Sequence, residues 1–89
     1  HDFENYTKAL LNNDFKQSRQ IIYSLYYRGY SVLDIFDNYF TYIKYDYNLT
    51  EIQKFKLIKL ICKYISIFHT IHEHQIELLL FTSNAMLIL

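Results

Sequence analysis

The spacing of apolar residues predicts helices along almost the whole chain. From residue 32 to residue 43 the apolar positions follow one another at steps of three and one, which places them on one side of an α-helix. Comparable patterns, separated by short polar breaks, predict helices over residues 2–11, 15–28, 31–43, 51–69 and 76–89. We therefore expect an all-α fold, a compact bundle of about five helices.

Short polar residues mark where these helices begin, because their side chains can accept hydrogen bonds from the unpaired amides of a first turn. Ser31 with Asp34, and Thr50 with Gln53, have the three-residue spacing of a capping box. Gly29 is placed to end the second helix in a left-handed conformation. The expected cap residues are Asp2, Asp14, Gly29, Ser31, Asp34 and Thr50.

The second and third helices each have one predicted core-facing side. In the second helix the inward positions are Phe15, Ser18, Ile22, Leu25 and Tyr26. In the third they are Val32, Ile35, Phe36, Tyr39, Phe40 and Ile43, with Asp34, Asp37, Asn38, Thr41 and Lys44 facing solvent.

The helix over residues 51–69 carries more apolar surface than one side can hold. Its apolar residues form two adjoining stripes, and a surface helix of a monomer needs only one. We expect the second stripe to pack on another helix of the domain or on another chain. The first stripe is Phe55, Ile58, Ile61, Cys62, Ile65 and Phe68, and the second is Leu57, Leu60, Tyr64 and Ile67.

The run from Ile76 to Leu89 is apolar almost all round its axis, so it is expected to lie in the core or in an interface. With Glu77 and Asn84 among its 14 residues it is too short and too polar to span a membrane.

The length and composition of the chain argue against several classes of function. A chain of 89 residues fits one domain, and we expect residues 1–89 to be a single helical domain from a longer protein. Because the chain has one Gly, it can form neither of the glycine-rich loops that cradle nucleotide phosphates, so no cofactor is expected within it. A net charge of zero argues against autonomous nucleic-acid binding. The serines and carboxylates fall at helix caps or on solvent faces, so no catalytic residues are expected.

The chain has one cysteine and a cluster of three histidines, which are residue types that can bind metal ions. Cys62 stands among apolar helical neighbours, so we expect it to be a small buried side chain in a reducing compartment. The expected localisation is intracellular, nuclear or cytoplasmic, with a large DNA virus as an alternative source. The spacing of His69 and His72 could suit zinc, but His74 would point elsewhere, and polar turn histidines are the preferred interpretation.

The order of these features resembles a known family. Residues 22–35, Ile-Tyr-Ser-Leu-Tyr-Tyr-Arg-Gly-Tyr-Ser-Val-Leu-Asp-Ile, resemble the helix, Gly-Tyr-Ser turn and Asp-Ile helix start of the C-terminal domain of replication factor C small subunits. Leu49-Thr50-Glu51 and Glu73-His74-Gln75-Ile76-Glu77-Leu78 are similar to the starts of its later helices. One departure is the absence of Gly from residues 68–72, so the last two helices could be continuous or could meet at a different angle from that of the family.

The resemblance implies a collar domain, through which the subunits of a clamp loader hold together in a ring. It also implies a parent protein with upstream ATPase domains, which would bind ATP and Mg²⁺ and would contact the sliding clamp and DNA. The partners of this segment would be other clamp-loader subunits, identical or different.

Two surfaces are the predicted subunit contacts. Tyr23, Tyr27 and Tyr30 lie away from the core side of the second helix, and Tyr buries a large area while its hydroxyl stays hydrated. The expected interface residues are Tyr23, Tyr27, Tyr30, Leu57, Leu60, Tyr64 and Ile67. The alternative function is a binding module that accepts one amphipathic helix of an unrelated protein in a groove lined by the last two helices.

Overall fold

The computed structural model describes residues 2–46, 48–68 and 74–89, and these form five α-helices with no strand. The predicted all-α fold is confirmed, and the predicted boundaries agree to within one or two residues. The helices are α1 (Asp2–Leu11), α2 (Phe15–Tyr27), α3 (Val32–Lys44), α4 (Glu51–Phe68) and α5 (Ile76–Ile88).

The helix ends form as the cap residues predict. The Asp14 carboxylate accepts a hydrogen bond from the Gln17 amide, and Ser31 Oγ accepts one from the Asp34 amide. Thr50 and Gln53 bond each other reciprocally, at 3.1 and 2.9 Å. Asp2 is the exception, because it lies inside the first turn of α1 and its carboxylate instead accepts a 2.6 Å bond from the Arg28 guanidinium at the end of α2.

Gly29 closes α2 with a pair of hydrogen bonds that a left-handed residue makes possible. Its φ is +107°, its amide bonds the Tyr26 carbonyl, and the Tyr30 amide bonds the Leu25 carbonyl. This is a Schellman motif, in which the chain reverses while the last carbonyls of the helix stay paired. The turn directs the chain straight into the Ser31 cap of α3.

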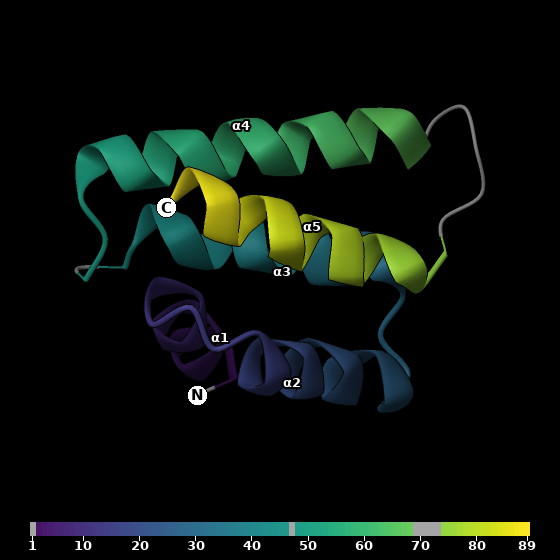
Figure 1. Ribbon diagram of the computed structural model, residues 1–89. Helices are drawn as coiled ribbons and strands as arrows, with labels where there is room; N and C mark the ends of the chain where they lie inside the picture. Colours follow the sequence, from purple (N-terminus) through teal and green to yellow (C-terminus); the bar gives the residue numbers. More distant parts are fainter. Residues whose placement is uncertain (1, 47, 69–73) are drawn as a thin grey trace.

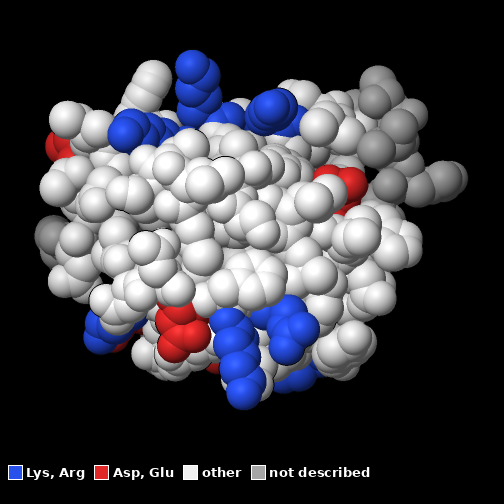
Figure 2. Space-filling view, in the orientation of Figure 1, with Lys and Arg blue, Asp and Glu red and all other residues white. Residues whose placement is uncertain are grey.

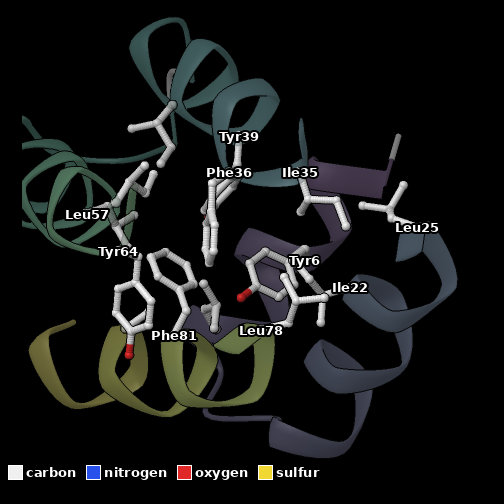
Figure 3. Close-up of a cluster of buried hydrophobic side chains, with 14 of the residues drawn as sticks. Tyr6, Ile22, Leu25, Ile35, Phe36, Tyr39, Leu57, Tyr64, Leu78 and Phe81 are labelled. Carbon is white, nitrogen blue, oxygen red and sulfur yellow. The ribbon is translucent and has the colours of Figure 1, made fainter. Parts of the chain in front are cut away.

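α5 lies in the middle of the bundle. It packs against α4 on one side and against α2 and α1 on the other, with α3 behind it (Figure 1). The side of α5 that faces inward consists of Leu78, Phe81, Thr82 and Ala85, all fully buried. The Phe81 ring lies 5.0 Å from Phe36 of α3 and 5.5 Å from Tyr64 of α4, so aromatic edge contacts connect three helices at the centre (Figure 3).

The core contains hydroxyl groups, and they are paired across helices. Thr82 Oγ1 donates to the Leu78 carbonyl, so the 2.7 Å bond between Tyr6 and Thr82 has the Tyr6 hydroxyl as its donor. Thr7 and Tyr39 join α1 to α3 in the same way at 2.8 Å. No buried side-chain nitrogen or oxygen of the described residues lacks a partner.

α4 corrects the predicted division into a core stripe and an interface stripe. The buried residues are Leu57, Ile61 and Tyr64, which come from both stripes. At about 100° per residue these three lie within about 60° of one another, so the core side of α4 falls on the seam between the stripes. Leu57 and Tyr64 therefore belong to the domain's own core, and their assignment to a subunit interface is wrong.

The outer edge of the first stripe is exposed as a consequence. Phe55 is 59% exposed, and Cys62 is exposed where a buried side chain was predicted, because it lies about 140° around the helix from Leu57. In α2, Ser18, Ile22 and Leu25 are buried as predicted, whereas Phe15, the first residue of the helix, is 40% exposed. The stripe of α3 is confirmed, with Phe40 half-buried.

Candidate interaction surfaces

The predicted tyrosine surface of α2 is only partly contiguous. The rings of Tyr23 and Tyr27 meet edge to face, 5.9 Å apart, and Tyr27 is 70% exposed while Tyr23 is half-buried. Tyr30 lies beyond the end of α2 and lines a different cavity, of about 570 Å³, together with Phe3, Leu25, Arg28 and Tyr42. Tyr23 and Tyr27 can therefore act as one patch, whereas Tyr30 belongs to another part of the surface.

The outer side of α5 is an apolar surface that no described element covers. Ile76, Leu80 and Leu87 are 51%, 48% and 83% exposed. With Ser83 they follow at steps of four, three and four, so they form one side of the helix, opposite the buried one. Glu77 is the one charged residue of α5, and the centre of the face in Figure 2, where α5 lies, carries few charged side chains.

A groove runs between α4 and the end of α5. It is lined by Lys56, Lys59, Leu60, Lys63, Leu87 and Ile88, and it continues along α4 past Glu51, Ile52 and Phe55. We call these residues the basic groove. Leu60, one of the predicted interface residues, is half-buried and lines its wall, and the remaining one, Ile67, is also half-buried.

A buried carboxylate that the sequence did not reveal lies near α3. Asp46 is 5% exposed, accepts a 2.7 Å bond from the Asn48 amide, and interacts with the Tyr42 hydroxyl. Burial, the hydrogen bond to Asp46 and the negative charge of Asp46 all raise the pKa of Tyr42. Asp46 stands in a loop, where no periodicity marks a residue as buried, so only its short turn-forming side chain could have pointed to it.

Of the three clustered histidines, His74 lies among the described residues. Its Nδ1 accepts a 3.1 Å hydrogen bond from the Ile76 amide, so this imidazole satisfies an amide at the start of α5. His69 and His72 lie outside the described residues. Among residues 2–46, 48–68 and 74–89, no three His, Cys, Asp or Glu side chains lie close enough to share a metal ion.

The last two helices are separate and antiparallel, and the predicted junction between them, residues 69–73, lies outside the described residues. α4 ends at Phe68, α5 begins at Ile76, and the two helices pack side by side (Figure 1). No described helix is both long and apolar enough to cross a membrane.

The family model of the replication factor C C-terminal domain matches residues 1–74. The chain belongs to this family. Neither a curated protein sequence nor a solved structure matches it significantly.

Membership makes the chain a C-terminal domain of a clamp-loader subunit, a non-catalytic part with a place in DNA replication. The match covers the Gly-Tyr-Ser turn and α1 to α4 and ends before α5. In this replication factor C C-terminal domain, the helix beyond the matched residues contributes Leu78, Phe81 and Ala85 to the core and leaves Ile76, Leu80 and Leu87 uncovered.

Proposed function

We propose that this replication factor C C-terminal domain holds clamp-loader subunits together in a ring, with the outer side of α5 as its main contact. The proposal rests on one observation, the row of Ile76, Leu80 and Leu87, which are each about half exposed or more on a helix with a single charged residue. Contiguous exposed apolar surface of this kind marks interaction sites, because monomeric proteins seldom leave it facing water.

The patch of Tyr23 and Tyr27 supports a contact that extends beyond α5. α2 packs directly against α5. The rings of the two tyrosines add apolar contact area, while their hydroxyl groups can stay hydrated at the edge of the contact. The neighbour in this proposal is another clamp-loader subunit, either an identical copy or a related chain. In a ring of subunits the contact is heterologous, so the two partners use different surfaces.

The wider activity belongs to the parent subunit. We infer that residues 1–89 are one domain of a longer ATPase, which binds ATP and Mg²⁺ and reaches the sliding clamp and DNA through other domains. The collar would then be the fixed part against which the ATPase domains move.

Light scattering tests the assembly role. The purified domain is measured alone over a range of concentrations and mixed with the other clamp-loader subunits of its own source. We expect a mass above that of a monomer in at least one of these conditions. Leu80→Lys should abolish the heavier species because it places a charge in the apolar row, while helix content by circular dichroism stays unchanged.

Thr41→Lys is the matched control. Thr41 is exposed on α3, away from α5, and the same charge is added there. A domain that stays monomeric alone and in every mixture, or equal effects of the two variants, would contradict the proposed assembly.

A further inference from the structure

The basic groove concentrates positive charge on a chain that is neutral overall. α4 holds Lys54, Lys56, Lys59 and Lys63 against one acidic residue, Glu51, whereas the whole sequence has nine basic and nine acidic residues. Within about 60° of one side of the helix lie Ile52, Lys56, Lys59 and Lys63, at steps of four, three and four. In Figure 2, basic side chains gather at the top of the view, where α4 lies.

The lysines of this row lack acidic partners in the described part of the chain. Lys54 forms the ion pair of this helix, with Glu51 at 3.8 Å. Lys56 Nζ instead donates to the Ile88 carbonyl at 3.3 Å, at the negative end of the α5 dipole. Lys59 and Lys63 form no ion pair among residues 2–46, 48–68 and 74–89, so both ammonium groups are free to meet an external carboxylate.

Apolar side chains accompany this charge along the groove. Ile52 is 68% exposed, Phe55 59% and Leu87 83%. A surface with apolar side chains along a helix and a lysine row beside them is complementary to an amphipathic helix with the opposite charge. The groove lies between two antiparallel helices, and its volume of about 660 Å³ can seat the side chains of a third.

The occupant is a different protein rather than a second copy of this chain. In a second copy, α1 and α3, each with two acidic residues, would have to supply the complementary surface, yet no large apolar side chain of α3 is exposed. On α1 only Leu11 is exposed, at 36% and at the opposite end from Asp2 and Glu4. α5 does have an exposed apolar row, but Glu77 is its single acidic residue. No helix of the described chain therefore combines an exposed apolar row with several carboxylates.

We propose that the basic groove of α4 and α5 binds an amphipathic helix of another protein, whose apolar row is flanked by Asp and Glu. Lys59 and Lys63 would pair with these carboxylates, while Phe55 and Leu87 would pack against the apolar row. The groove shares only Leu87 with the outer side of α5, so this inference and the proposed ring contact can fail separately.

Peptide binding measured by fluorescence anisotropy tests the inference. The probes are two designed helical peptides with the same leucine row, one flanked by Glu and the other by Lys. We expect the acidic peptide to bind and its affinity to fall as salt is raised, because exposed ion pairs are screened. The double variant Lys59→Glu with Lys63→Glu should weaken that binding on the order of tenfold or more and should gain binding to the basic peptide.

Lys16→Glu with Arg19→Glu is the control, since it makes the same charge change at exposed positions of α2. It should leave binding of the acidic peptide unchanged. Equal binding of the two peptides, equal effects of the two double variants, or NMR shift changes away from Lys59, Lys63 and Leu87 would overturn the proposal. A Lys59 and Lys63 variant that loses the peptide but keeps the mass of the assembly would support the groove independently of the ring contact.

Discussion

The Tyr6 hydroxyl in α1 donates a 2.7 Å hydrogen bond to Thr82 Oγ1 in α5, although 76 positions separate the two residues along the chain. Both residues are fully buried, so the bond forms away from water. It joins the first helix to the helix at the centre of the bundle. Its loss should therefore lower the stability of the whole fold.

Replacing Tyr6 with Phe removes this hydroxyl without removing the ring. We expect the free energy of unfolding to fall by about 1 kcal/mol, because a buried hydrogen bond is lost while Thr82 keeps its bond to the Leu78 carbonyl. Urea denaturation measures the change. Tyr45→Phe is the matched control, because Tyr45 is 73% exposed, and it should leave stability unchanged. Equal losses in the two variants would contradict the importance of the buried bond.

Alkaline pH should destabilise the domain. Burial raises the pKa of Tyr6 and of Tyr39 above the ordinary value of 10.0, so above pH 10 the unfolded chain releases these protons before the folded protein does. The folded state then binds more protons than the unfolded state, and stability falls as pH rises, by up to about 1.4 kcal/mol per pH unit for each such group. Below pH 10 these tyrosines make no pH-dependent contribution.

Chemical denaturation at pH 8, 10 and 11 checks this dependence. Tyr6→Phe removes one of the titrating groups, so its stability should fall less steeply between pH 10 and 11 than that of the unsubstituted protein. If stability fell equally steeply with pH in both proteins, Tyr6 would titrate alike in the folded and the unfolded state.

The Schellman turn predicts a cost for a side chain at Gly29. Gly29→Ala should lower the free energy of unfolding by about 1 to 2 kcal/mol, because an L-residue is strained at a φ of +107°. No atom lies within 4 Å of the added Cβ, so the loss comes from the backbone and not from a clash. Ser24→Ala, at an exposed position inside α2, serves as the control, and thermal unfolding distinguishes the two.

The seam of α4 predicts opposite behaviour for two of its aliphatic residues. Leu57→Ala should cost about 2 to 5 kcal/mol, since Leu57 is fully buried and the substitution leaves a cavity. Ile52→Ala should change stability little, because Ile52 is 68% exposed. If Leu57→Ala instead weakened assembly without lowering the stability of the fold, Leu57 would belong to a subunit interface after all.

The parts of this structure that the sequence predicted are those governed by local rules. Ser31, Thr50, Asp14 and Gly29 act on amides and carbonyls within a few residues, so their roles could be deduced from their place in the chain. The stripe of α3 was predicted correctly for a related reason, since its opposite side is continuously polar and leaves one orientation available.

α4 could not be oriented in the same way. Its apolar residues cover so much of the circumference that several rotations about its axis are compatible with the pattern, and only packing against Phe36 and Phe81 selects the seam at Leu57, Ile61 and Tyr64. The exposure of Cys62 and Phe55 follows from that choice. The pairing of Asp2 with Arg28 and the burial of Asp46 are likewise products of tertiary arrangement.

The central place of α5 has a consequence for biosynthesis. While the ribosome is still adding the residues of α4, the hydrophobic sides of α1, α3 and α4 lack part of their packing, because Leu78, Phe81 and Ala85 have not yet been made. Contacts that span this much of the chain form slowly, and incomplete helical intermediates attract one another. We therefore expect a chain that ends just before α5 to be an aggregation-prone polypeptide instead of a smaller working domain.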